Sequence, residues 1–149
     1  MEEKMNEMKL EEFHKRSEAR RQRMLTERQA WPPKEVAVLT WEHRGLRCAI
    51  ASGPLGNLNG YVHIPATHPD NAKWYAEVKV DVHGGLTFMC RDLDGGTWYG
   101  FDTSHYGDMM ILPTGIYDGR RWDIDSVKAE TERLADQLAD AILLQEGGA

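Results

Sequence analysis

The sequence lacks a long hydrophobic run and an excess of positive charge. Its 149 residues carry 24 acidic and 18 basic side chains, which gives a formal net charge of −6 at pH 7. No apolar stretch approaches the ~20 residues that cross a bilayer, and the N-terminus has no apolar core of a secretory signal. Non-specific nucleic-acid binding needs a basic surface that displaces counterions from phosphates. We therefore expect no membrane and no nucleic acid as partner, but a small molecule or another protein.

Cysteine is scarce, and familiar catalytic motifs are missing. Cys48 and Cys90 both fall on the apolar phase of predicted strands, so we interpret them as reduced core residues of a cytosolic protein. The glycine-rich stretch 52–60 lacks the Lys-Ser/Thr pair of a P-loop, but it is long enough to fold over a pocket. No Gly-x-Ser-x-Gly elbow is present, and Cys90 has no evident activating partner. Whether the protein is an enzyme stays open.

Glycine and proline are both absent from residues 1–29, which are rich in Glu, Lys, Arg and Gln. This composition favours a long helix. Its apolar positions are sparse and follow no sustained heptad, so we expect an arm that is solvated or binds a partner, including a second copy of the chain. Trp31 and the two prolines after it end the helix. We therefore divide the chain into a charged helical arm, residues 1–30, and a single domain, residues 31–149.

Alternation of apolar and polar side chains dominates the body and predicts strands. We expect them at residues 36–41, 46–51, 61–64, 78–82, 86–90, 97–101 and 108–112. The three strands between 78 and 101 are expected to form an antiparallel meander. A helix capped by Asp123 or Asp125 should run to Gln145, with apolar residues at three- and four-residue steps. The predicted fold is α+β: a mainly antiparallel sheet covered by the C-terminal helix, plus the long charged N-terminal helix.

Polar side chains gather where the predicted meander ends. His83 leaves the wet face of its strand on the same sheet edge where the third strand ends at Asp102, so these two should be neighbours. His105 and Asp108 follow at the strand exit. The proline after His68 would hold that residue extended, which could point its ring into the same site. We predict that His68, His83, Asp102 and His105 converge on one concavity.

Three interpretations of this cluster stay open. Imidazole and carboxylate groups together suit a divalent metal, which would favour a metal-dependent hydrolase. The candidate metal ligands are His83, Asp102, His105 and Asp108. Alternatively, the cluster belongs to a metal-free pocket for a small, nucleotide-like ligand, joined by aromatic and cationic side chains. These additional side chains are Trp74, Arg91, Tyr99 and Tyr106. In the third interpretation the groups only cap turns and complete hydrogen bonds. Among the functions, ligand binding ranks first because it requires the fewest unobserved features, ahead of the hydrolase and of a protein-interaction module that acts through residues 1–29.

Three segments taken together resemble a family of short uncharacterised proteins encoded by actinobacterial phages and prophages. They are GYVHIPATHP (60–69), VKVDVHGGLTF (78–88) and GFDTSHYGD (100–108). The similarity runs from about Trp41 to the C-terminal helix and leaves out the N-terminal arm. It implies a phage or prophage origin and a small accessory protein in the host bacterial cytoplasm that interferes with host defence, through a small molecule or a host protein. The resemblance supplies no mechanism.

Overall fold

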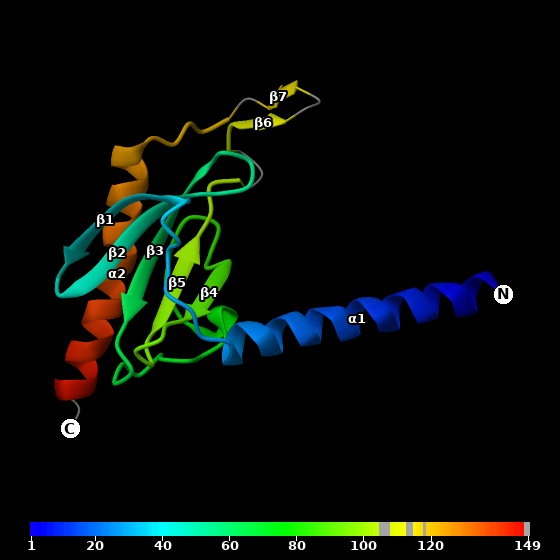
Figure 1. Cartoon of the computed structure of the whole chain (residues 1–149), viewed down its shortest axis with the longest axis horizontal. Coiled ribbons are helices and arrows are strands. Elements are labelled where there is room, and N and C mark those ends of the chain that lie inside the picture. The colour runs from blue at the N-terminus through cyan, green and yellow to red at the C-terminus, as the bar shows by residue number, and fades with distance from the viewer. Residues whose placement is uncertain (105–107, 113–114, 118, 148–149) are drawn as a thin grey trace.

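The sheet at the centre of the fold is antiparallel and has five strands. The computed structural model describes residues 1–104, 108–112, 115–117 and 119–147. The strands are β1 (Ala37–His43), β2 (Leu46–Ser52), β3 (Leu58–Ile64), β4 (Phe88–Arg91) and β5 (Thr97–Phe101), in spatial order β1-β2-β3-β5-β4. Figure 1 shows helix α2 behind this sheet and the chain that follows helix α1 in front of it. The predicted α+β fold is confirmed.

Helix α2 (Ile124–Gly147) covers one face of the sheet, which we call the α2 face, and completes the main core. Leu134 and Leu138 on the helix are fully buried together with strand residues such as Ile50 and Val62. The three- and four-residue spacing of its apolar side chains therefore produces the contact that the sequence predicts. Asp123 begins the helix, because its carboxylate accepts the Ser126 N–H at 2.7 Å.

Two glycines let aromatic rings lie against the sheet. Gly60 of β3 pairs with Phe101 of β5, and Tyr61 pairs with Gly100. A Cβ atom at Gly60 would clash with the ring of Phe101, and a Cβ atom at Gly100 would clash with the ring of Tyr61. Each ring therefore needs the missing side chain opposite it. The Phe101 ring belongs to the core under α2, whereas Tyr61 belongs to a cluster on the other face.

Two parts of the predicted sheet are wrong. Residues 78–82 form no strand, so only the β4–β5 hairpin of the expected three-strand meander is present. Strand β6 (Met110–Leu112) does not join the main sheet but pairs with β7 (Gly115–Tyr117) in a separate two-stranded sheet. Between η1, a short 3-10 turn (Tyr75–Glu77), and β4, the chain runs beside helix α2 instead.

Side chains of α2 explain why residues 78–82 alternate without forming a strand. The Gln137 side chain accepts the Asp81 N–H and donates to the Asp81 carbonyl, both at 2.7 Å. Glu130 accepts the His83 N–H, also at 2.7 Å. Val78 and Val82 are buried in the main core, and Val80 packs against it half-buried. The segment thus packs like a strand while the helix satisfies its backbone, which local alternation does not distinguish from sheet pairing.

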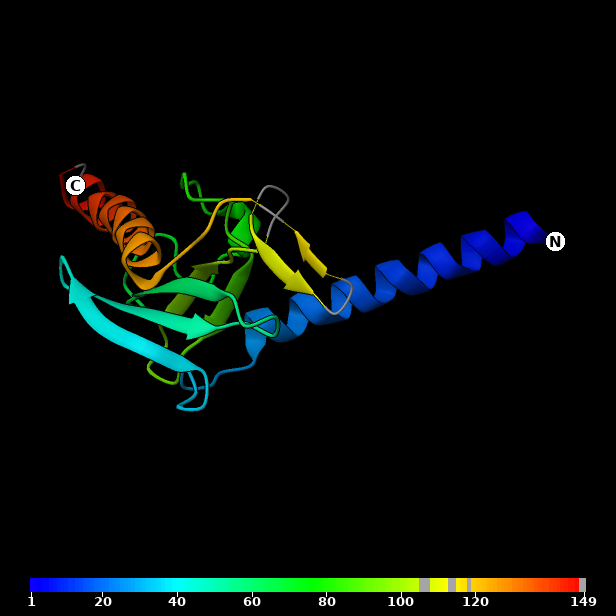
Figure 2. The same ribbon diagram turned by 90° about the horizontal axis from the view of Figure 1, so that it is seen from above.

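Helix α1 (Glu2–Thr26) projects from the body as an arm (Figure 1 and Figure 2). None of its residues is buried. At its base, Met24 and Leu25 pack against the main core, and the Gln29 N–H donates to the Arg91 carbonyl at 2.9 Å. The last turn of the arm is therefore attached to the body, while the preceding turns extend away from it. Among the described helices, none combines the length and apolarity that crossing a membrane requires.

Candidate functional site

The sheet face opposite α2 carries a second, smaller apolar cluster, and we call it the open face. Its buried members are Ala49, Ala51, Tyr61, Cys90 and Trp98. Within the described residues, the side chains packed over them are Trp31, Val36 and Phe88. Cys90 lies here and Cys48 lies in the main core, so the sheet separates two free, buried thiols, as the sequence predicts.

Three aromatic rings pack together on the open face. The Trp31 and Phe88 rings lie 4.6 Å apart, and the Tyr61 ring meets both edge-on at 5.3 and 5.2 Å, all measured between ring centroids. Trp31 also lines two hollows, one of about 570 Å³ and one of about 390 Å³. The smaller hollow is shared with Arg47 and Trp98. Trp31 thus lies at the centre of the open face.

The larger hollow combines aromatic rings with polar and charged side chains, and we call it the aromatic groove. Its wall contains the three packed rings. Ser52 at the end of β2 and residues 53–54 of the following loop also line it, so that loop borders a pocket as expected. A cation comes from α1 and an anion from the end of β5. Its lining includes Arg20, Trp31, Asn59, Tyr61, Phe88 and Asp102.

Part of the groove lining is held in place by hydrogen bonds. Asn59 is buried, and its side-chain oxygen accepts the Thr103 N–H at 3.3 Å. The Asp102 carboxylate accepts the Ser104 N–H at 3.1 Å. Burial raises the pKa of Tyr61, while a hydrogen bond with Asn59 opposes the shift and the charge of Asp102 adds to it. A hydroxyl, an amide and a carboxylate therefore lie close together beside the rings.

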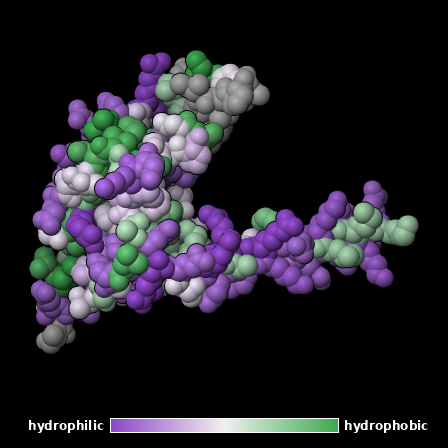
Figure 3. Space-filling view, in the orientation of Figure 1, coloured by the Kyte–Doolittle hydropathy of each residue, from purple (hydrophilic) through white to green (hydrophobic). Residues whose placement is uncertain are grey.

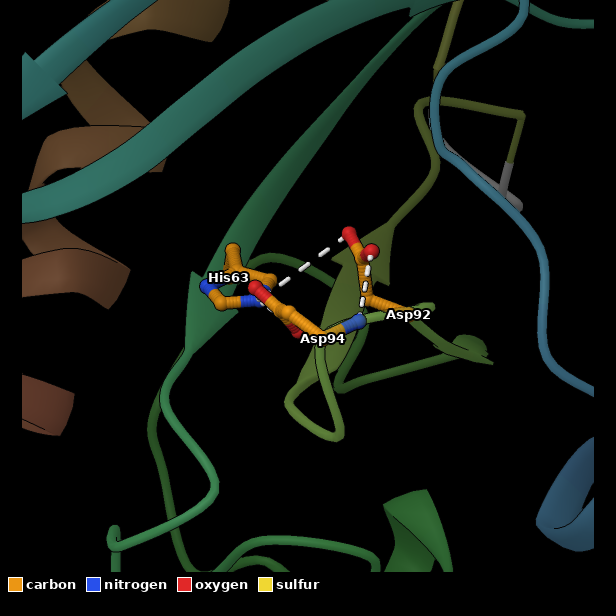
Figure 4. Close-up of side chains that lie close together, drawn as sticks. All are labelled: His63, Asp92 and Asp94. Atoms are coloured by element: carbon orange, nitrogen blue, oxygen red, sulfur yellow. Dashed lines mark hydrogen bonds and ion pairs between the residues drawn. The ribbon is translucent and has the colours of Figure 1, made fainter.

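A second group of polar side chains on this side of the sheet contains His63, Asp92 and Asp94 (Figure 4). The His63 Nε2 atom lies 3.1 Å from Asp94 Oδ2 and 3.9 Å from Asp92 Oδ2. Trp98 Nε1 donates to the Asp92 carboxylate at 2.7 Å, and Arg47 donates to Asp94 at 2.8 Å. The group joins β2, β3 and the β4–β5 turn into one charge network.

Among the described residues, His63, Asp92 and Asp94 are the group whose spacing suits a metal, with candidate ligand atoms within 4.8 Å of one another. An imidazole and two carboxylates suit a divalent ion. Burial acts to raise the pKa of Asp94, but the Gly96 N–H, His63 and Arg47 together lower it. The Arg47 cation therefore already compensates the carboxylate that an ion would need, so metal binding requires Arg47 to move.

Two of the candidate metal ligands, His83 and Asp108, lie in contact, although Asp108 was not among the four residues predicted to converge. His83 Nε2 lies 2.9 Å from Asp108 Oδ2, and Trp122 Nε1 donates to the other carboxylate oxygen at 3.0 Å. Asp108 is buried. The Arg120 guanidinium stacks over the Trp122 ring at 3.7 Å from its centroid. A buried carboxylate that orients a partly exposed imidazole can support proton transfer, although this pair lacks the third ligand of a metal site among the described residues.

His68 does not join this group, so the predicted convergence is wrong for it. Its Nε2 donates to the Leu138 carbonyl at 2.8 Å, and its Nδ1 accepts the Asp70 N–H at 2.9 Å. Nε2 thus attaches the loop after β3 to helix α2, and Nδ1 holds a turn within that loop. Asp102 lines the aromatic groove, where it caps its own turn. His105, a predicted ligand, lies outside the described residues.

The aromatic and cationic residues expected to hold a ligand are used elsewhere. Tyr99 is buried on the α2 face, and its hydroxyl contacts the carbonyls of Asp70 and Lys73. Arg91 donates to backbone carbonyls at the base of the arm and in the β4–β5 turn. Trp74 stacks on Tyr75 with ring centroids 4.2 Å apart. We correct the prediction for these three, whose contacts are structural. Tyr106 lies outside the described residues.

Sequence reasoning missed most of the groove. Trp31 was assigned to the end of the arm helix, and Tyr61 to a short strand, without a shared role. One signal was available: Tyr61 and His63 occupy the strand phase opposite Val62, so they had to face away from the main core. The position of Arg20 at the groove depends on the direction in which the arm leaves the body, and the sequence does not show this direction.

Comparison with known proteins gives no further guide: no family model, no curated protein and no solved structure matches the chain. The resemblance to phage-encoded proteins therefore stays a prediction.

Proposed function

We propose that the protein binds a small ligand with a planar, nucleobase-like ring in the aromatic groove. One observation carries this proposal: three aromatic rings and two polar groups line the same groove. The rings are those of Trp31, Tyr61 and Phe88, and the polar groups are the Asn59 amide and the Asp102 carboxylate. Stacking on such rings contributes about 1–3 kcal/mol per base and tolerates different bases. The polar groups then select which ring edge fits.

One buried polar atom supports a ligand with a hydrogen-bond acceptor. The Trp31 Nε1 atom is buried and has no hydrogen-bond partner among the described residues. A buried donor without a partner costs about 1–3 kcal/mol. A carbonyl, ring nitrogen or phosphate oxygen that reaches Trp31 Nε1 would remove this cost. Such an acceptor is present on every nucleobase and nucleotide.

Arg20 supports a ligand that carries negative charge. Its side chain lines the groove from helix α1. A guanidinium makes strong, charge-assisted hydrogen bonds to phosphate oxygens. The residues of the body are acidic as a set, with ten basic against seventeen acidic side chains in residues 31–149, so a phosphate needs such a cation nearby. A ring on the aromatic side chains and a phosphate near Arg20 together describe a nucleotide.

The groove lining favours holding a ligand over converting it. The described lining contains no histidine and no cysteine, and the buried network of His63 lies elsewhere on the sheet. We therefore propose sequestration. If the resemblance to phage-encoded proteins holds, the ligand is a nucleotide signal of a host defence system; this step rests on the resemblance alone.

Isothermal titration with mononucleotides and cyclic nucleotides tests the proposal on the full chain. Arg20→Ala should weaken binding about tenfold, the size of a charge-assisted hydrogen bond. Arg16→Ala is the matched control: Arg16 lies one turn away on the same side of the helix, pairs with Glu12 and does not line the groove, so this variant should bind as the wild type does. Asp102→Asn removes a charge from the polar part of the lining but keeps an acceptor for the Ser104 N–H. Equal affinities in all three variants would contradict the proposal.

A metal-dependent hydrolase is the second candidate function. The observation that favours it is the spacing of His63, Asp92 and Asp94, beside a hollow of about 360 Å³ that His63 and Asp94 line. A bound ion there would activate water for hydrolysis. It ranks below ligand binding because Arg47 already pairs with Asp94 at 2.8 Å.

A further inference from the structure

The charges of the arm are separated into two halves. Residues 1–13 contain five glutamates and two lysines, whereas residues 14–29 contain six basic and two acidic side chains. The structure shows that both halves belong largely to one continuous helix without a buried residue. An acidic half and a basic half on one exposed rod match each other only when a second rod lies alongside in the opposite direction.

The outer part of the arm also exposes large apolar side chains. Met5, Met8, Leu10 and Phe13 are each more than half exposed. Figure 3 shows the arm as a mainly hydrophilic projection with pale green, more hydrophobic sections. A charged helix that touches the body only at its base is marginal in water, because most helix stability comes from tertiary packing. A partner along the outer turns would supply this packing.

We propose that the arm pairs with the arm of a second copy of this chain, in antiparallel orientation. Leu10 and Phe13 are three residues apart and lie on one side of the helix, near its middle. Two antiparallel arms therefore place these apolar side chains together at the centre of the pair. A parallel pair would instead set acidic half against acidic half and basic half against basic half.

A specific register follows from that centre. When Leu10 of each arm lies level with Phe13 of the other, Glu3 lies level with Arg20 of the second copy and Glu2 with Arg21. Arg21 also lies 3.4 Å from Glu77 of its own body, so Glu2 would share this cation. The two-fold symmetry of the pair repeats each of these contacts. The first turn of each arm thereby reaches the base of the other arm, where Arg20 and Arg23 line a hollow of about 200 Å³. The pairing is argued from the arm alone, but it shares Arg20 with the aromatic groove, so the association is measured without nucleotide.

Sedimentation equilibrium of the full chain tests the pairing. We expect a dimer at low salt that weakens as salt screens the exposed charges. Leu10→Ser with Phe13→Ser should give a monomer, whereas Met5→Ser with Met8→Ser, on the other side of the helix, should leave the dimer intact. The melting temperature of the body reports folding in each variant. A wild type that is monomeric at every concentration would overturn the proposal, and so would equal effects of the two double variants.

Charge reversal tests the match between the halves. The triple variant Glu2→Lys, Glu3→Lys, Glu7→Lys should be monomeric because both halves of its arm are then positive. The triple variant Arg16→Glu, Arg20→Glu, Arg21→Glu, which changes the partners of Glu7, Glu3 and Glu2 in the proposed register, should be monomeric for the opposite reason. The chain that combines all six changes exchanges the halves and should recover the dimer. A combined chain that stays monomeric while its body melts normally contradicts charge matching.

Cross-linking tests the orientation. Asn6 and Ser17 lie on the same side of the helix as Leu10, and the proposed register sets Asn6 of one copy level with Ser17 of the other. A mixture of the Asn6→Cys and Ser17→Cys chains should form a disulfide between different chains, and each variant alone should not. The native cysteines are buried and do not interfere. Disulfides only between identical variants would show parallel pairing and overturn the proposal, as would a partner of another kind that displaces the second copy.

Discussion

The two faces of the central sheet use the same strands but differ in their cover. On the α2 face a 24-residue helix lies over the strands, and large side chains such as Phe101 and Leu134 are at most 1 % exposed. On the open face the strands present small residues such as Ala49 and Ala51, beneath a short segment that crosses them. The first arrangement is a closed core, whereas the second leaves hollows beside the aromatic rings.

This difference decides what polar groups can do. Under α2, His68 and Tyr99 use their polar atoms to bind backbone carbonyls, so these groups stabilise the fold. On the open face, Arg20 and Asp102 reach a groove, and the Trp31 Nε1 donor is unpaired among the described residues. The polar groups of His68 and Tyr99 therefore hold backbone, whereas polar groups of the open face line a hollow that is open to a ligand.

Placing a charge in the closed core should have the largest effect. Leu134→Asp is expected to lower the free energy of unfolding by roughly 3–5 kcal/mol, because an unpaired carboxylate would be buried between the helix and the sheet. Leu143→Asp, an exposed position on the same helix, is the matched control and should change it by less than about 0.5 kcal/mol. Chemical denaturation measures both. Similar values for the two variants would mean that α2 is not part of the core.

A change on the open face should lower the free energy of unfolding less than a charge in the closed core does, but it should weaken ligand binding more. Gly100→Ala would force the Tyr61 ring from its place, with an expected loss of about 1–3 kcal/mol. It should also remove nucleotide binding, since Tyr61 lines the groove. Gly147→Ala, whose added Cβ meets no atom, is the control. If Gly100→Ala binds as tightly as the wild type, the ring of Tyr61 has no role in the site.

The charge network of His63, Asp92, Asp94 and Arg47 should add a small amount to the free energy of unfolding, and this amount should be lost in acid. The folded protein holds the pKa of Asp94 below its ordinary value. The resulting stabilisation is complete above about pH 4, the unfolded pKa, and is lost as pH falls through the lowered folded pKa. Because Asp94 is half exposed, we expect no more than about 1 kcal/mol. Asp94→Asn should flatten this part of the stability curve; Asp125→Asn should not. Parallel curves for wild type and Asp94→Asn would exclude the network as its source.

Metal ions should have the smallest effect. Zn²⁺ or Mn²⁺ added to the full chain is expected to leave the melting temperature unchanged, because Arg47 already pairs with Asp94. Calorimetry with and without a chelator measures this. A rise in the wild type that disappears in His63→Ala would reverse the ranking and favour the hydrolase candidate.

Local sequence patterns were sufficient to predict the elements whose structure depends on residues close together in the sequence. The β1–β2 hairpin and helix α2 were predicted because alternation and helical spacing report directly on burial. The segment 78–82 failed because its backbone partners, Gln137 and Glu130, come from a helix some fifty residues later, as their hydrogen bonds show. Alternation reports which side chains are buried, and it does not report what satisfies the backbone between them.

The candidate site was less accessible to sequence reasoning for the same reason. His83 and Asp108 were predicted as members of one ligand set, but the neighbour predicted for His83 was Asp102, and its contact with Asp108 was not predicted. The aromatic groove draws Arg20, Trp31 and Tyr61 from three separate segments, which only tertiary packing brings together. His68 was misassigned because a polar residue in a loop looks the same whether it meets a ligand or a helix carbonyl.

The tryptophan indole signals in a nitrogen–proton NMR spectrum test the central claim most directly. The five tryptophans are distributed over the molecule, and Trp31 lies in the groove, whereas Trp122 lies beside Asp108 and Trp98 in the charge network. Trp31→Phe assigns the critical signal. Adding a nucleotide that binds should shift the Trp31 signal by far the most. A spectrum in which the Trp31 signal stays fixed while that of Trp122 or Trp98 moves would contradict the open face as the binding site.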